Sequence, residues 1–78
     1  MEIKIILAPF KYSFCEIVKK EIPLYCKNKG WKSTQIVNTE RIYDVTYYPQ
    51  TQVIINGNIV EVLEGINCKE IINKLNKY

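Results

Sequence analysis

The chain contains no histidine and only one arginine among its 78 residues. Histidine is the usual acid–base group near neutral pH and the commonest metal ligand, so its absence excludes the most frequent proton-transfer and metal sites. The three cysteines are an odd number without paired spacing, which argues against both a disulfide framework and a zinc site. We therefore expect neither a metal nor a resident cofactor.

Long apolar runs and a strong excess of one charge are also missing. Residues 3–8 form an apolar run that Lys4 interrupts, and this run is far too short to span a bilayer. The chain also lacks the basic start and the small-residue cleavage site of a secretory signal. These absences predict a cytoplasmic protein without a membrane partner. The net charge of +3 is small and its lysines are scattered, which argues against a nucleic-acid partner.

The sequence does contain enough apolar material for one small globular domain, because 47% of its residues are hydrophobic. Its clearest local pattern is a pair of β-branched runs, residues 53–55 and 59–63, which are typical of strands. Asn56-Gly57 lies between them and tolerates the positive φ angles of a type I′ hairpin turn. Pro49 cannot donate a ladder hydrogen bond, so we place it before the first of these strands.

A strand and a helix are expected at the start of the chain. Residues 1–8 form a β-branched apolar run that is typical of a buried strand. Ser13 then caps a helix over residues 14–28, with Glu16 at the capping-box position and Gly30 as the stop. The apolar stripe of this helix follows helical spacing and comprises Phe14, Ile17, Val18, Ile22, Tyr25 and Cys26.

A second strand over residues 31–37 completes a strand–helix–strand unit, whose two strands should pair in parallel. Residues 38–43 leave room for only a single helical turn, capped by Asn38 or Thr39. After the hairpin, Asn67 caps a last helix. The apolar stripe of this last helix comprises Cys68, Ile71, Ile72 and Leu75.

The second half of the chain carries a lead-in of the form Tyr-x-Val, a proline before a strand, an Asn-Gly turn and a glycine before the last helix. These features lie at Tyr43, Val45, Pro49, Asn56-Gly57 and Gly65. The order and spacing of these residues resemble those of the thioredoxin and glutaredoxin superfamily. The resemblance implies one α/β, thioredoxin-like domain over residues 1–78, in the order β-α-β-β-β-α. It implies a four-stranded mixed sheet, a truncated or missing middle helix and a cis peptide bond at Pro49.

The same resemblance directs attention to Cys15, near the start of the first expected helix. Thioredoxins use a thiolate there, because backbone amides and the helix dipole lower its pKa, and a second cysteine three residues later resolves the mixed disulfide. Here Val18 stands in place of that second cysteine. By resemblance, Pro23, eight residues after Cys15, implies that Cys15 is the nucleophile. The helix length to Gly30 implies instead that Cys15 is the second cysteine and Tyr12 occupies the nucleophile position, so both alignments stay open.

The other two cysteines are poor candidates for the missing partner. Cys26 lies eleven residues after Cys15, which is about 16 Å along a helix, whereas a disulfide needs Cα atoms within about 7 Å. Cys26 and Cys68 both fall on apolar stripes, so we interpret them as core residues. An exposed Cys15 would allow a disulfide-linked dimer as well as a monomer.

Two functions are consistent with these features. The first is thiol–disulfide exchange through Cys15 as the only catalytic cysteine, with glutathione, another low-molecular-weight thiol or a protein cysteine as partner. The segment from Cys15 to Val18 departs from the C-G-F-S motif of monothiol glutaredoxins, which weakens the case for glutathione. The second function is a redox-inactive module that binds a protein partner through an aromatic surface. By resemblance this surface surrounds the cis-proline loop, and its binding residues are Tyr12, Phe14, Tyr48 and Pro49, with Phe10 and Tyr47 nearby.

Overall fold

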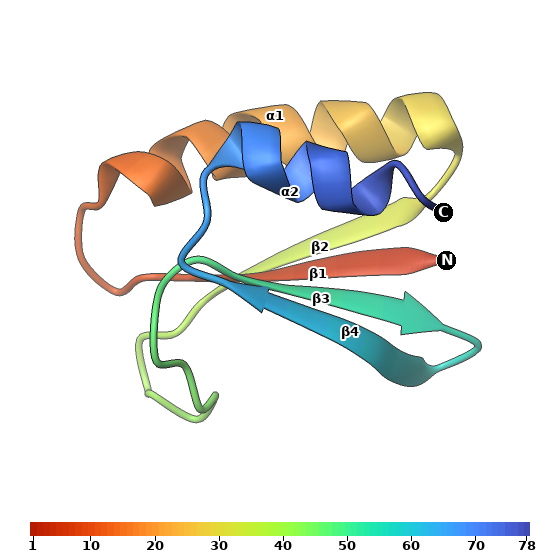
Figure 1. Ribbon diagram of the computed structural model, residues 1–78. Coiled ribbons are helices and arrows are strands. Elements are labelled where there is room, and N and C mark those ends of the chain that lie inside the picture. Colours follow the sequence, from red (N-terminus) through yellow and green to blue (C-terminus); the bar gives the residue numbers. More distant parts are fainter.

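One mixed β-sheet with both helices on a single face forms the protein (Figure 1). The computed structural model describes residues 1–78. In chain order the elements are β1 (Glu2–Leu7), α1 (Ser13–Lys29), β2 (Lys32–Val37), β3 (Gln50–Ile55), β4 (Asn58–Glu64) and α2 (Cys68–Leu75). The sheet order is β2-β1-β3-β4, in which β1 and β2 are parallel and the other neighbours are antiparallel. The predicted α/β class, element order and mixed four-stranded sheet are confirmed.

The core lies between the sheet and the helix layer. Successive side chains of a strand face opposite sides, so alternate residues of β1, namely Ile3, Ile5 and Leu7, are buried together. They belong to one cluster with Val18, Ile22 and Cys26 of α1, Val53 of β3, and Ile71 and Leu75 of α2. Full burial of an aliphatic side chain contributes about 1.5–3 kcal/mol. This cluster therefore holds both helices against the sheet.

Helix α1 differs from the prediction at its start and along its apolar stripe. Tyr12 is the N-cap, without a side-chain hydrogen bond, and Ser13 is already helical, so the predicted Ser13 cap is wrong. The buried residues of α1 are Cys15, Val18, Ile22 and Cys26, whose spacing of three, four and four places them on one face. Ile17 lies off that face and is 53% exposed. Its predicted place in the core is therefore also wrong.

The predicted hairpin is confirmed. Asn56 and Gly57 have φ angles of 53° and 79°, and a type I′ turn requires positive values at both positions. The Tyr48–Pro49 peptide bond is cis, as expected, and β3 follows it directly. Strand β3 begins three residues before the predicted run, because Gln50 also pairs with β1.

Residues 38–49 contain no helix, which agrees with the expected truncated or missing middle helix. A hydrogen-bonded turn does begin at Asn38, whose carbonyl accepts the Arg41 backbone N–H at 3.2 Å, but it does not continue into a helix. Asn38 is 2% exposed, and its side chain accepts a hydrogen bond from the Tyr43 backbone N–H at 3.2 Å and donates one to the Tyr43 carbonyl at 3.1 Å. Asn38 thereby satisfies both backbone polar groups of Tyr43, and this stabilises residues 38–43 as a closed loop without helical hydrogen bonds. The loop extends over the sheet face opposite the helices (Figure 1), where Lys4 Nζ lies 5.0 Å from the centre of the Tyr43 ring.

Helix α2 starts as predicted, because the Asn67 side chain accepts a hydrogen bond from the Glu70 backbone N–H at 2.9 Å. The segment after α2 is anchored to β4 through Glu61, which accepts a hydrogen bond from the Tyr78 hydroxyl and lies 3.0 Å from Lys77 Nζ. These two partners lower the pKa of the Glu61 carboxyl. Neither helix combines the length and the apolar character that are needed to cross a membrane.

Candidate functional site

Four aromatic side chains meet where the loop after β1 passes the loop before β3. The ring centres of Phe10 and Tyr48 lie 5.9 Å apart, those of Phe10 and Tyr12 6.4 Å, and those of Tyr12 and Phe14 5.5 Å. We name these four residues the aromatic cluster. The contact between Phe10 and Tyr48 places the two loops side by side. Phe10 is the most exposed member at 56%, so the cluster presents an apolar ring to solvent.

Tyr48 is the member of the cluster that a side-chain hydrogen bond ties to the rest of the protein. Its hydroxyl accepts a hydrogen bond from Asn38 Nδ2 at 2.9 Å, and its ring packs against the core. Asn38 thus joins the loop before β3 to the end of β2. Sequence reasoning had considered Asn38 only as a helix cap. Its position directly after a β-branched strand is the signal that could have indicated a buried polar anchor.

A hydrogen-bonded network of polar side chains from β3 and β4 also holds the same loop in place. Gln50 Nε2 donates to the Asp44 carbonyl at 3.1 Å and to Glu64 Oε2 at 2.9 Å. The same Glu64 oxygen accepts the Thr46 backbone N–H at 3.2 Å, and Gln52 Nε2 donates to Gln50 Oε1 at 2.8 Å. Sequence reasoning missed this network, although the alternation of Gln50 and Gln52 along β3 is a visible signal for a polar stripe.

Tyr47 and Pro49 lie beside the cluster, at the end of the loop before β3 and next to Gly65, which follows β4. Tyr47 is 67% exposed, and its Cβ lies close to Gly65. Pro49 is buried, and its carbonyl accepts a hydrogen bond from the Gly65 backbone N–H at 3.3 Å. Gly65 has a φ angle of 67°, a left-handed conformation that glycine adopts readily. Gly65 therefore shapes the surface next to the aromatic cluster.

Cys15 lies in the first turn of α1, but its side chain faces the core. It is only 6% exposed. Burial is the largest influence on its thiol and raises the pKa, the hydrogen bond with the Ala8 backbone lowers it, and the charges of Glu16 and Lys19 act in opposite directions. The net result is a raised pKa, because burial outweighs the Ala8 hydrogen bond and the Lys19 charge at this position.

The other two thiols also have raised pKa values. Burial raises the pKa of Cys26 to about 11, and burial together with the Glu21 carboxylate raises that of Cys68. Cys26 is fully buried in the core, as predicted, whereas Cys68 is half-buried at the edge of the helix layer. All three cysteines are free, and no group of three or more cysteine and acidic side chains is arranged to hold a metal ion.

We expect Cys15 to be alkylated in the native protein at least about tenfold more slowly than in the urea-unfolded chain, because the thiolate is the reactive form. Mass spectrometry after timed iodoacetamide treatment at several pH values measures the rate at each cysteine. Cys26 is the internal control for a fully buried thiol. Fast alkylation of Cys15 with an apparent pKa below the usual value of about 8.5 would contradict this expectation.

The chain was also compared with known proteins. Neither the scan against models of protein families nor the search of curated proteins found a match.

Proposed function

We propose that this chain is a thioredoxin-like, redox-inactive binding module that contacts a protein partner through its aromatic cluster. The observation that carries the proposal is an exposed ring, Phe10, packed on a tyrosine that the protein anchors from within. Aromatic rings that are exposed yet held in place are typical of the centres of protein interfaces, because little conformational entropy is lost on binding. The proposal includes a cytoplasmic location.

The thioredoxin-like part of the proposal rests on the arrangement of elements. The order β1-α1-β2-β3-β4-α2, the position of Pro49 directly before β3 and the two helices on one face all agree with the resemblance of the sequence. The interval from 38 to 49, where larger members of that superfamily carry a helix, is a loop. This loop carries Tyr48, so the segment that replaces the helix contributes one residue to the proposed binding surface.

The binding role is favoured over redox chemistry by the state of Cys15. Its thiol is buried, its pKa is raised, and the core cysteine Cys26 lies eleven residues further along the same helix. The superfamily resemblance also suggests that the Tyr48 backbone pairs with an extended peptide. Anchoring of the Tyr48 side chain to Asn38 keeps this bulky residue packed within the protein, which leaves Phe10 and Tyr12 as the exposed contacts.

Thiol–disulfide exchange through Cys15 is the second candidate. It is favoured by the position of Cys15 in the first turn of α1 and by its hydrogen bond with the Ala8 backbone, which lowers the thiol pKa. In that reaction the Cys15 thiolate attacks a disulfide of glutathione, another small thiol or a protein. A mixed disulfide with Cys15 forms, and the second sulfur leaves as a thiolate.

A display library of random twelve-residue peptides tests the binding role. We expect the protein to select peptides, and Phe10→Ala to weaken their binding at least about tenfold, because truncation removes the exposed centre of the cluster. Val60→Ala is the matched control, since Val60 is 52% exposed on β4, outside the cluster. Cys15→Ser should leave binding unchanged. Failure to select any peptide, or full binding by Phe10→Ala, would count against the module.

A further inference from the structure

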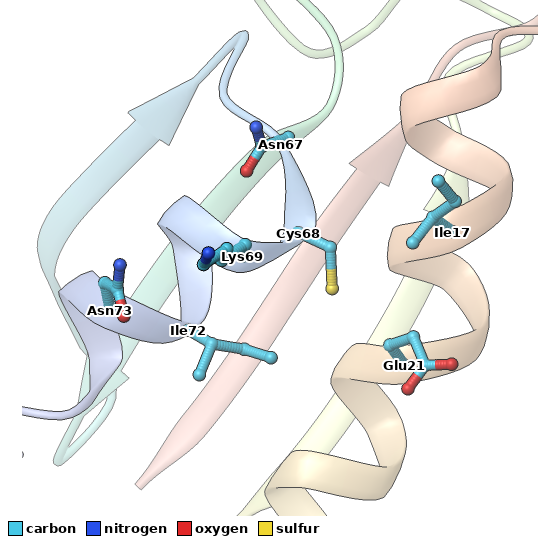
Figure 2. Close-up of a pocket in the computed structure, with 7 residues that line it drawn as sticks. All are labelled: Ile17, Glu21, Asn67, Cys68, Lys69, Ile72 and Asn73. Carbon is cyan, nitrogen blue, oxygen red and sulfur yellow. The ribbon is translucent and has the colours of Figure 1, made fainter.

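The charges of the helix layer are balanced around the groove between α1 and α2 (Figure 2). This groove has a volume of about 460 Å³, and Glu21 of α1 and Lys69 of α2 stand on its two walls. The first halves of the two helices carry equal numbers of acidic and basic side chains, namely Glu16, Lys19, Lys20, Glu21, Lys69 and Glu70. The groove therefore favours neither an anionic nor a cationic partner.

The C-terminal ends of the helices are different, because they carry only lysines. Lys27 and Lys29 lie in the last turn of α1, and Lys74 lies in the last turn of α2. All three are exposed, and none forms an ion pair within the chain. Lys77 also lies near this end, but Glu61 neutralises it. Of the 11 basic residues in the chain, the other eight balance the eight acidic residues, so these three lysines account for the net charge of +3.

Contacts between the helices bring these lysines to one end of the molecule. The Tyr25 hydroxyl of α1 donates a hydrogen bond to Asn76 Oδ1, directly after α2. Both helices end on the same side of the layer, near the start of β1 (Figure 1). Glu2 at the start of β1 lies on the other face of the sheet, because its neighbour Ile3 faces the core. The helix side of this end therefore carries an excess of positive charge.

Two aromatic rings lie at the same end. The ring centres of Tyr25 and Trp31 are 5.8 Å apart, and Lys29 Nζ lies 5.9 Å from the first centre and 5.6 Å from the second. The helix dipole stabilises lysines at these positions, but it does not account for the rings. Both rings also pack against the core, so they are held in place. Lys29 has no carboxylate partner, and its side chain can leave the rings for an anion.

We propose that this basic end, formed by Tyr25, Lys27, Lys29, Trp31 and Lys74, binds single-stranded nucleic acid. The lysines contact phosphates, and an unpaired base stacks on the Trp31 ring. Basic side chains combined with an aromatic ring are the usual means of binding single strands without sequence preference. Lys29 exchanges its contact with the rings for a phosphate and thereby uncovers the face of Trp31. The bases of a duplex are already stacked on one another, so a duplex offers no base to this ring.

The rings are the reason for choosing nucleic acid over an acidic protein. An acidic peptide can neutralise the lysines, whereas every nucleotide supplies both a phosphate and a planar base. The scattered lysines of the sequence argue against a nucleic-acid partner, but the fold brings the three unbalanced ones to one end. This site lies at the opposite end of α1 from Tyr12 and Phe14 of the aromatic cluster. It therefore does not rest on the proposed binding function.

Fluorescence anisotropy with labelled twelve-residue oligo(dT) and oligo(U) in low salt tests DNA and RNA separately. We expect binding whose logarithmic salt dependence has a slope of about −2, because each of three phosphate contacts with a single strand contributes about −0.7. Trp31 is the only tryptophan, and stacking of a base should quench its fluorescence. Trp31→Ala should weaken binding at least about fivefold. Trp31→Phe keeps a ring and should recover part of the loss.

The lysine variants test the phosphate contacts. Lys74→Ala should weaken binding about threefold and reduce the salt slope by about 0.7. Lys69→Ala is the matched control, because Lys69 lies at the balanced end of α2, and it should bind like the wild type. Circular dichroism establishes that each variant is folded. Absence of binding to both oligonucleotides, equal affinity for poly-glutamate, or wild-type binding by folded Trp31→Ala and Lys74→Ala would each overturn the proposal.

Discussion

Replacing Asn38 with alanine should lower the free energy of unfolding by about 3 kcal/mol. The Asn38 side chain makes three hydrogen bonds, two with the Tyr43 backbone and one with the Tyr48 hydroxyl. Alanine would leave those groups without a partner at a position that is 2% exposed, and each unsatisfied group has its own desolvation cost. A domain of this size has a stability of roughly 4–12 kcal/mol, so the loss would be a large fraction of the total.

Urea denaturation followed by far-ultraviolet circular dichroism measures this change. Asn28→Ala is the matched control, because Asn28 is exposed near the end of α1, and its replacement should change stability by no more than about 0.5 kcal/mol. Tyr48→Phe separates the contributions, since it removes one of the three bonds and leaves Tyr43 paired. We expect Tyr48→Phe to cost about 1 kcal/mol. Equal stability of Asn38→Ala and wild type would show that the loop does not depend on this side chain.

Gly65→Ala should also cost about 3 kcal/mol, from two separate causes. The φ angle of Gly65 is 67°, and an alanine in the left-handed region loses about 1–2 kcal/mol. An added Cβ would in addition lie 2.8 Å from Tyr47 Cβ, a contact that forces one of the two segments to move. Overpacking of this kind costs about 1–3 kcal/mol in well-packed sites. The variant should therefore also disturb Tyr47 beside the aromatic cluster.

The hairpin provides a control that isolates the second cause. Gly57 has a φ angle of 79°, and no heavy atom lies within 4 Å of the position where its Cβ would be. Gly57→Ala should lose only the backbone contribution. The difference between the two variants in thermal or urea unfolding reports the contact with Tyr47. Equal losses would mean that the loop moves aside without cost, and that Gly65 has only a conformational role.

The sequence predicted those parts of the fold that depend on local chemistry. Asn56-Gly57 requires a particular turn, and alternating or continuous β-branched runs require strands, so the hairpin and the order of elements were predictable. The start of α1 was not. Ser13 and Glu16 have capping-box spacing, but the path of the loop after β1 makes Ser13 the first helical residue. Ile17 fits a helical stripe in the sequence equally well, and only the position of the sheet decides which stripe is buried.

The site was less predictable than the fold, because it depends on contacts between distant segments. The resemblance of the sequence placed Phe10 near the cis-proline loop, and the structure shows its ring in contact with Tyr48. The burial of Cys15 did not, because a residue in a first helical turn can face either the core or solvent. The role of Asn38 depends on residues five and ten positions later in a loop without regular structure. No periodic pattern indicates hydrogen bonds of that kind.

The central position of β1 has a consequence for how the chain folds. Strand β1 precedes every other element, yet its antiparallel neighbour is β3, with partners that lie 44 residues apart for Ile6 and Gln50 and 52 apart for Glu2 and Ile54. The β3–β4 turn closes after only two residues, so bringing β1 to β3 carries roughly 2–3 kcal/mol more loop-closure entropy. We therefore expect the hairpin to form early and its docking onto β1 to limit the folding rate. Destabilising the hairpin turn should then slow folding, whereas changes to contacts that form after this docking should mainly speed unfolding.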